Sequence, residues 1–419
     1  MRLPRVYRIR QALQCPVVAD VAAEARAAIG SLPLRGRLTP GARIAVTGGS
    51  RGVANIATML RTTCDYLKDL GARPFIVPAM GSHGGATAEG QLEVLARYGV
   101  TPETMGVQIL SSMETIEIGR MEWGLPVLVD RHACEAEHIV LVNRVKPHTS
   151  IRGPIESGLL KMLVIGLGKH QGALLAHRAA VDVGLERMVL EVSRLSLSKL
   201  SVLFGLASVE NARHQTALVE AILPEQLEAA ETRLLQRAKV LIARIPFDFL
   251  HLLIVDEIGK EISGGCMDSN VIGRIAREGV FDPTAPKYLR IFARDLTEQS
   301  GGNADGLGAA DFVTRRLVEK VDLHVTYTNA IASIAPLGAK LPMMYDTDHQ
   351  AIEAALATIG LTEPPDAKVA RIRNTLALEH LHVSEALLPE VRKRPELEVL
   401  EGPFEFRFGE TGNLIDQVE

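Results

Sequence analysis

The sequence predicts an α/β protein with two domains, a larger N-terminal domain with a mostly parallel sheet and a smaller C-terminal α/β domain. Three observations support this prediction. The 419 residues exceed what one hydrophobic core usually serves. Short apolar, β-branched runs alternate with amphipathic segments, as in parallel sheets whose strands are joined by helices. Glycine-rich loops follow several of these runs, so we expect the active site in the cleft between the domains.

The first domain shows this alternation most clearly. A predicted helix lies between the first two strand-like runs, with Ile56, Met59 and Leu60 on one face and Gly71 suited to its C-terminal cap. A second helical pattern covers 89–100. The predicted strands are 43–47, 72–79, 107–110, 125–130 and 137–143.

A long helical pattern at 224–245 precedes the apolar strand-like run 249–259, and we place the domain boundary between them. The domains are then 1–247 and 248–399. The tail, 400–419, can fold back on the first domain. The second domain is predicted to contain a glycine-rich loop with a helix start, a strand, a glycine-rich loop leading into a helix, another strand and an edge strand, at 263–279, 288–295, 300–320, 322–330 and 363–375.

The composition limits the kinds of partner. With 46 basic and 50 acidic side chains and a net charge of −4, the chain has no bulk feature that favours nucleic acid or an anionic membrane. The four cysteines are scattered without a CxxC pair, which excludes a thiolate zinc site and a disulfide framework and suits a reducing cytoplasm. The N-terminal stretch mixes charges with apolar residues, unlike a secretory signal. A small polar substrate and a cytoplasmic location are expected.

Two histidines lie in loops that follow predicted strands. His83 stands between small residues in GSHGGAT, which leaves its ring open to a ligand. His148 follows Pro147 and has basic neighbours that could hold an anion. The alternatives are a loop histidine bonded to the backbone and a solvated basic loop. Both loops belong at the carboxyl edge of the sheet, so the two imidazoles can serve one crevice as a pair of proton acceptors.

Lys161 lies in an apolar segment and His177 follows sixteen residues later. A lysine in this setting extends to solvent, pairs with a carboxylate such as Glu156, or reacts as an amine with a lowered pKa. His170 and His177 share a helix face, which is usually a structural arrangement. They are too far apart to bind one zinc ion together, whereas a metal already held by an organic cofactor needs only one histidine.

Arg51 in TGGSRG sits between a strand and a helix, where a guanidinium and backbone N–H groups would meet a carboxylate or phosphate. The turn resembles a dinucleotide-binding loop without the GxGxxG spacing. A nicotinamide-dependent dehydrogenase is therefore one alternative function.

Taken together and in this order, GSHGGATAE, PHTSIRG, Lys161, His177 and SGGCMDSN resemble the lactate racemase family, the nickel-pincer nucleotide enzymes. The resemblance covers most of the chain. It implies that Lys161 forms a thioamide link to a pyridinium-derived mononucleotide and that His177 completes the coordination of nickel. It also implies that His83 and His148 act as alternating acid and base, and that Arg51 helps to seat the substrate carboxylate.

The sequence departs from this family's pattern in the second domain. Gly273 and Ala276 stand where lactate racemases have a glutamine and a lysine, and Arg274 between them is a candidate for the lost cation in substrate binding. The loop around His148 also differs. These departures indicate a 2-hydroxy acid other than lactate.

The resulting expectation is an isomerase, a nickel-pincer nucleotide-dependent racemase or epimerase of a 2-hydroxy acid, because inversion needs two bases where a one-way dehydrogenase needs one. A non-catalytic carrier of the nickel nucleotide is a third reading, which the paired histidines disfavour. Expected partners are the hydroxy acid and, transiently, the cofactor-synthesis enzymes; a homodimer stays open.

Overall fold

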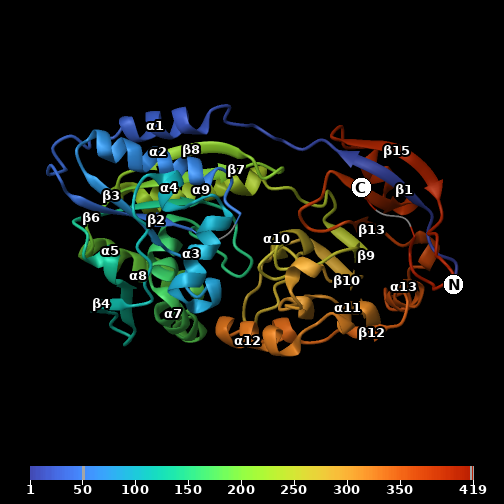
Figure 1. Cartoon of the computed structure of the whole chain (residues 1–419). Helices are drawn as coiled ribbons and strands as arrows, with labels where there is room; N and C mark the ends of the chain where they lie inside the picture. The colour runs from blue at the N-terminus through green and yellow to red at the C-terminus, as the bar shows by residue number, and fades with distance from the viewer. Residues whose placement is uncertain (50–51, 416–417, 419) are drawn as a thin grey trace. The chain divides into compact units, whose positions relative to one another are not determined.

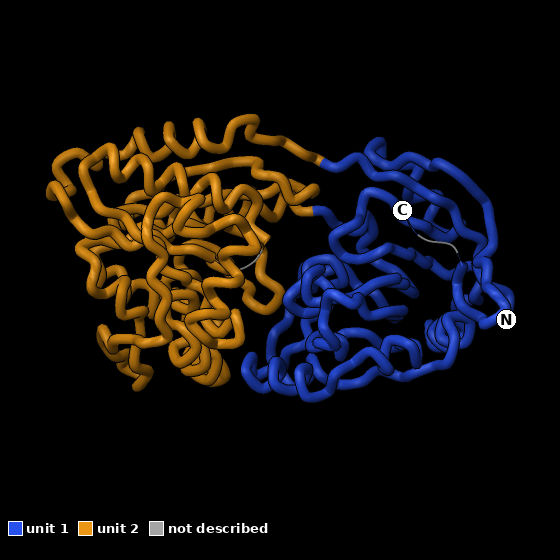
Figure 2. The backbone as a smooth tube through the Cα atoms, in the orientation of Figure 1, with its two compact units in different colours: residues 1–13, 243–419 blue, residues 14–242 orange. Residues whose placement is uncertain are grey.

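The computed structural model describes residues 1–49, 52–415 and 418. The chain divides into two compact units, coloured separately in Figure 2. Unit 1 consists of Met1–Leu13 and Ala243–Glu419, and unit 2 is Gln14–Ile242. The chain therefore passes between the units twice.

Unit 2 is built on a five-stranded sheet with the order β3-β2-β6-β7-β8 (Figure 1). The first four strands are parallel, and β8 is antiparallel to β7. The core residues of these strands are buried on both faces, as a mostly parallel sheet requires. The strands are β2 (Arg43–Gly48), β3 (Arg73–Pro78), β6 (His138–Arg144), β7 (Val202–Glu210) and β8 (Thr216–Ile222).

Helices cover both faces of this sheet. Side chains of α1 (Val21–Gly30) and α2 (Ile56–Asp69) share one apolar cluster with β2 and β7. The opposite cluster contains side chains of helices from the second half of the unit. These are α6 (Leu159–Lys161), η2 (Met162–Gly166), α7 (Lys169–Val183), α8 (Leu185–Lys199) and α9 (Leu227–Leu241).

Smaller elements complete unit 2. Side-chain caps begin several of them; for example, Thr87 accepts a hydrogen bond from the backbone of Gly90 at the start of α3. The elements are η1 (Gly84–Ala86), α3 (Ala88–Arg97), α4 (Pro102–Met105), β4 (Thr115–Arg120), β5 (Pro126–Asp130), α5 (Arg131–Cys134) and η3 (Pro224–Gln226).

Two predicted strands of this unit were wrong in their placement. The segment 107–110 is not a strand of the sheet. It forms one isolated parallel bridge, between Ile109 and Ile76 of β3. The segment 125–130 is a strand, yet it pairs with β4 in a separate antiparallel hairpin and not with the main sheet. The apolar alternation of 125–130 predicts a half-buried strand, but it does not predict which strand pairs with it.

Unit 1 contains an eight-stranded sheet with the order β12-β11-β10-β9-β13-β14-β1-β15. The strands from β12 to β13 are parallel, and the remaining pairs are antiparallel. The strands are β1 (Val6–Gln11), β9 (Phe249–Val255), β10 (Lys287–Ala293), β11 (Phe312–Thr314), β12 (Met343–Tyr345), β13 (Val369–Ile372), β14 (His380–Ser384) and β15 (Leu397–Phe404).

Short helices connect these strands. They are α10 (Ser269–Ile272), η4 (Glu298–Ser300), η5 (Leu307–Ala309), α11 (Arg315–Glu319), α12 (Leu323–Ser333), η6 (Pro336–Ala339), α13 (Asp348–Leu356), η7 (Pro364–Asp366), η8 (Glu385–Leu387) and α14 (Leu388–Val391). The mixed α/β class expected from the sequence is confirmed in both units.

Unit 1 differs from the expected organisation in three places. The segment 322–330, predicted as a strand, is helix α12, and the predicted edge strand at 363–375 contains β13, which lies inside the sheet between β9 and β14. Residues 1–13, expected in the N-terminal domain, belong to unit 1 because β1 is hydrogen-bonded on both sides, to β14 and β15. The segment 400–415 lies in unit 1 with β15 and not with residues 14–242.

Within the described residues, no helix is both long and apolar enough to cross a membrane. All four cysteines are free thiols, which agrees with the absence of a disulfide framework expected from their spacing.

Candidate functional site

The candidate residues of unit 2 lie beyond the carboxyl ends of parallel strands. Strands β2, β3 and β6 run in the same direction, so their carboxyl ends meet at one edge of the sheet. The loop after β3 contains His83, and the loop after β6 contains His148. The chain then continues into the helices that contain Lys161 and His177. This edge is where open α/β sheets bind their ligands.

The His83 loop is fixed mainly through its backbone. His83 precedes the short helix η1, and its N–H donates to the carbonyl of Met80 at 3.2 Å. The buried side chain of Gln91 donates to the carbonyl oxygens of Gly81 at 2.9 Å and of His83 at 3.4 Å. Gly84 has a φ of +66°, and a Cβ there would lie 2.5 Å from the backbone of Gly90. The glycine therefore allows the loop to lie directly against α3.

A buried carboxylate organises the His148 loop. Glu156, 1% exposed, accepts a hydrogen bond from the N–H of His148 at 2.7 Å. Its other oxygen lies 2.6 Å from the ammonium of Lys239 on α9, and Arg152 lies 4.0 Å away. Its contacts with the His148 backbone and with Lys239 hold the loop in place.

The protonation state of His148 follows from its surroundings. Its Nδ1 accepts a hydrogen bond from the backbone N–H of Ser150 at 2.9 Å, so the neutral ring has its proton on Nε2. Burial lowers the pKa of His148 well below the usual 6.5, and the nearby charges of Lys161 and then Lys146 lower it further. His148 is therefore neutral at pH 7.

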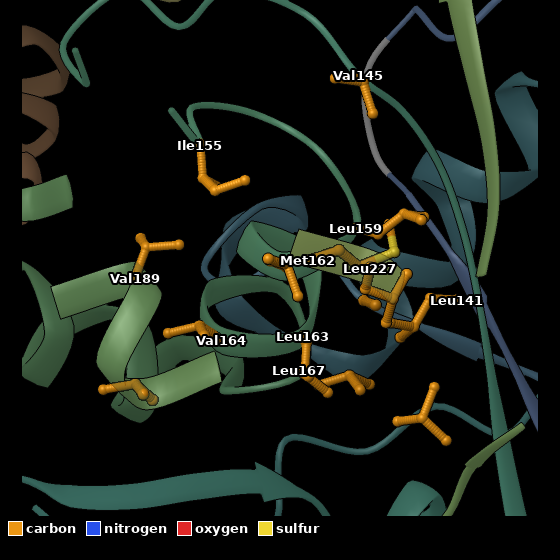
Figure 3. Packing of buried hydrophobic residues seen from close by; sticks show 14 of the residues in the cluster. Leu141, Val145, Ile155, Leu159, Met162, Leu163, Val164, Leu167, Val189 and Leu227 are labelled. Carbon is orange, nitrogen blue, oxygen red and sulfur yellow. The ribbon is translucent and has the colours of Figure 1, made fainter. Parts of the chain in front are cut away.

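Lys161 ends the three-residue helix α6, and a π-helical turn, η2, begins at the next residue. π-helical turns are rare in proteins, and those that do occur often lie at functional sites. Lys161 is half-buried, whereas the residues around it pack into the core. Figure 3 shows these apolar side chains around the turn, among them Leu159, Met162, Leu163, Leu167 and Val189.

His177 lies in the middle of α7 and is half-buried, whereas His170 at the start of the same helix is exposed. The His83 loop contacts this helix: a Cβ on Gly81 would lie 3.5 Å from the Cβ of Ala173, one turn before His177. The N–H of Gly81 also donates to the carbonyl of Gly166 in η2 at 3.1 Å. The loop after β3 is thus attached to the helices that contain Lys161 and His177.

His148, Lys161 and His177 interact electrostatically at this edge, and the loop that contains His83 is attached to the same helices. Lys161 and His177 both act on the pKa of His148, and charges shift a neighbouring pKa appreciably only over short distances. The His83 loop joins them through Gly81, which contacts η2 and α7. The arrangement offers two imidazoles, one amine and a third imidazole within one unit.

Of the two arginine candidates, Arg51 lies outside the described residues, and Arg274 belongs to the other unit. Arg274, in unit 1, forms an ion pair with Asp311 at 2.8 Å and donates to the carbonyl oxygens of Ala309, Tyr288 and Leu289. These contacts hold the segments on either side of β10 together. The role of Arg274 in substrate binding stays a prediction.

The backbone explains one of the departures in the second domain. Gly273 ends α10 in the left-handed conformation, with φ +72°, and a Cβ there would lie 2.0 Å from the carbonyl oxygen of Pro286. No side chain, glutamine included, fits at this position without moving the backbone. Ala276 packs against the unit 1 core. Both positions are structural in this chain.

The side chains of this site also bear on whether it could bind a metal. A metal held by protein side chains alone requires three or four ligands. No group of three histidine, cysteine, aspartate or glutamate side chains suited to a metal occurs within the described residues. A single imidazole such as His177 can nevertheless complete the coordination of a metal that an organic cofactor already binds. His177 is therefore a candidate ligand for a metal that an organic cofactor holds.

Sequence reasoning missed three residues that support the site. Glu231 on α9, fully buried, accepts hydrogen bonds from the N–H groups of Leu159 and Leu160 at 2.8 and 3.0 Å and so fixes the start of α6. Burial raises its pKa to about 7. Lys169 and Gln91 are also fully buried. The only sequence signal for them was a charged or amide side chain on an otherwise apolar helix face.

Two comparisons with known proteins find similarity to lactate racemases. Residues 7–184 match the lactate racemase N-terminal domain, a range that includes His83, His148, Lys161 and His177. The first part of the chain is therefore similar to this domain. The structure of the lactate racemase apoprotein from Thermoanaerobacterium thermosaccharolyticum is similar to this lactate racemase-like chain, with a TM-score of 0.57 and 13% sequence identity. The match covers 89% of this chain and 99% of that one and shows a common fold. No curated protein matches the sequence.

Proposed function

We propose that this lactate racemase-like protein is a racemase or epimerase of a 2-hydroxy acid that uses a nickel-pincer nucleotide. The observation that supports the proposal most directly is the grouping of His148, Lys161 and His177, with the His83 loop attached, within residues that match the lactate racemase N-terminal domain. The family is known for a nickel cofactor. A carrier that only stores the cofactor does not need two acid–base groups.

Each residue has a defined task in this proposal. The amine of Lys161 holds the nucleotide through a covalent link, and a ring nitrogen of His177 binds the nickel. When bound, the cofactor supplies a reversible acceptor for the hydrogen of the α-carbon. His83 and His148 hold or move the proton of the substrate hydroxyl on opposite faces of that carbon.

The tautomer of His148 determines which role this residue can take first in the reaction. In the neutral ring the proton is on Nε2, so His148 first presents an N–H donor to a substrate oxygen. To take up a hydroxyl proton at Nε2 the ring must transfer its own proton to Nδ1, which requires the hydrogen bond from Ser150 to break. In this tautomer His148 can donate a hydrogen bond to a substrate oxygen, and a change of tautomer must precede its action as a base at Nε2.

The test uses protein co-expressed with cofactor-making enzymes and enantiopure 2-hydroxy acids and aldonates. The holo-protein is expected to reduce the optical purity of one of them, and in D₂O the α-hydrogen should return without exchange. Lys161→Ala should remove the covalent mass from the intact protein, and His177→Ala should abolish nickel retention. Lys199→Ala and His170→Ala are matched controls, because both side chains are exposed.

Three outcomes would contradict the proposal in different ways. Unchanged nickel content in His177→Ala would exclude that residue as the ligand. Cofactor binding without loss of optical purity in any substrate would indicate a carrier. Saturable dinucleotide binding and net oxidation without nickel would indicate a dehydrogenase.

A further inference from the structure

The side chain of Lys169 is completely buried in unit 2, although lysine is rarely buried without partners. Its ammonium lies 3.1 Å from the carboxylate of Asp130, which is also completely buried. It donates hydrogen bonds to the side-chain oxygen of Gln91 at 3.1 Å and to the carbonyl of Pro78, the last residue of β3. Burial lowers the pKa of Lys169, and the charge of Asp130 opposes this change. Three polar groups therefore satisfy the ammonium at the carboxyl end of β3.

The backbone at Lys169 is in an unusual conformation. Its φ is +54°, in the left-handed region that non-glycine residues rarely adopt. Glycine would adopt this conformation more easily, and the preceding residue is Gly168. A lysine here indicates that the side chain has a task that glycine could not perform. The residue also begins α7, the helix that contains His177.

Gln91 extends this network to the His83 loop. It is completely buried, and its side-chain oxygen accepts from Lys169. Its side-chain nitrogen donates to the carbonyl oxygens of Gly81 at 2.9 Å and of His83 at 3.4 Å. A continuous series of contacts therefore runs from Asp130 through Lys169 and Gln91 to the backbone of His83.

We propose that Lys169 and Gln91 are positioning residues that fix the His83 loop relative to helix α7, and so set the place of the His83 imidazole at the site. The catalytic consequence rests on the proposed function; the positioning of the loop does not. Lys169 belongs to α7 and binds the last residue of β3. Gln91 binds both Lys169 and the backbone of the loop. Neither side chain contacts the substrate in this proposal.

The decisive variant is Gln91→Glu. Glutamate retains an oxygen for Lys169, whereas it loses the N–H groups that bind Gly81 and His83. In the cofactor-free protein the ring signals of His83 in an NMR spectrum are expected to shift, and amide exchange of residues 79–87 is expected to accelerate. The control is Gln171→Glu on the exposed side of α7, which should leave both unchanged.

In the loaded enzyme, Gln91→Glu is expected to lower kcat about tenfold or more with little change in KM, the usual scale for losing a group that orients an active-site residue. Wild-type His83 signals and wild-type loop exchange in Gln91→Glu would overturn the positioning role. Failure to find any racemised substrate would leave the NMR and exchange result intact, so failure of the proposed function is distinguishable.

A second variant tests Lys169 itself. Removing the lysine alone leaves the Asp130 carboxylate buried without its counter-ion, which strongly destabilises a folded protein. The double variant Lys169→Met with Asp130→Asn removes both charges together. We expect it to fold and to show the same shift of the His83 signals as Gln91→Glu. Unshifted signals in the folded double variant would contradict a role for Lys169.

Discussion

Single buried charges in unit 2 act on the backbone of neighbouring segments as well as on other charges. Glu156 binds the N–H of His148, and Glu231 binds the N–H groups of Leu159 and Leu160. In both cases an acidic side chain lies beneath a segment that contains a site residue. Among the described residues no ion pair offsets the burial of Glu231, and burial raises its pKa to about 7.

The raised pKa predicts a pH-dependent stability for which Glu231 is responsible. Between pH 4.5 and 7 the carboxyl is ionised in the unfolded chain and protonated in the folded protein, so the free energy of unfolding falls as pH rises through this window. The full effect is on the order of 3 kcal/mol above pH 7. Glu231→Gln keeps an oxygen for the two N–H groups, and urea unfolding should show that it gains stability relative to wild type as pH increases.

The control for this experiment is Glu228→Gln on the same helix. Glu228 is half-buried and pairs with Arg194, which lowers its pKa. Its substitution should not produce a relative gain at high pH. A difference between Glu231→Gln and wild type that stays constant from pH 5 to pH 8 would show that the carboxyl of Glu231 is not perturbed.

The residues that belong to loops and helix faces were predictable from the sequence to different degrees. His83, His148, Lys161 and His177 stood out because glycine-rich or apolar surroundings are unusual for them, and the structure brings their segments together. Lys169 and Gln91 are 78 residues apart and have no local signal of their contact. Their roles arise only when β3, α3 and α7 are packed.

At the level of elements, the short helices after β6 are shaped by close approach to β3. A Cβ on Gly166 would lie 2.6 Å from the carbonyl oxygen of Ala79, and the N–H of Gly81 donates to Gly166. This approach attaches the π-helical turn after Lys161 to the His83 loop. The glycine is required by its neighbour and not by its own backbone angle.

Gly166→Ala is therefore expected to push η2 away from β3 and to destabilise the protein, by about 1–3 kcal/mol, the usual cost of an extra methyl group in a packed interior. It should also reduce loading of Lys161, measured by intact mass. Gly172→Ala in α7 is the matched control, because its new methyl group would meet atoms only at 3.5 Å or more and alanine favours a helix. Equal unfolding midpoints for the two variants would contradict this account.

One predicted element illustrates where local reasoning fails. The segment 322–330 has valine, threonine and tyrosine at a density typical of strands. It forms α12 because Asp322 accepts a hydrogen bond from the N–H of Val325 and caps the helix. Several of its large apolar side chains stay exposed, so strand-like composition did not reflect burial in a sheet.

At the level of the whole molecule, the sheet of unit 1 is assembled from both ends of the sequence. Strand β1 pairs with β14 on one side and β15 on the other, and its Ile9 is completely buried among residues from the second half of the chain. The predicted domain boundary at 247 lies close to the second crossing, after Ile242. Pattern reasoning had no means of assigning residues 1–13 to the distant unit, because a strand's partners are not encoded locally.

A substitution near the start of the chain should therefore destabilise unit 1. Ile9→Ala is expected to cost about 2–5 kcal/mol, the range for truncating a buried aliphatic side chain. Hydrogen exchange of β14 and β15 should accelerate, while that of β2 and β6 in unit 2 should not. Arg10→Ala, which removes only an exposed ion pair with Glu398, should have little effect. Faster exchange confined to unit 2 would refute the assignment of β1.

The placement of β1 also has a consequence for synthesis of the protein. Residues 14–242 can fold as soon as they have emerged from the ribosome, since all five strands of their main sheet are then available. Strand β1 must wait for β14 and β15, and at about 5–20 residues per second that delay lasts tens of seconds. During this time the residues of β1 precede the folded unit 2 without their strand partners. Completion of the sheet of unit 1 is therefore a late event in the synthesis of the chain.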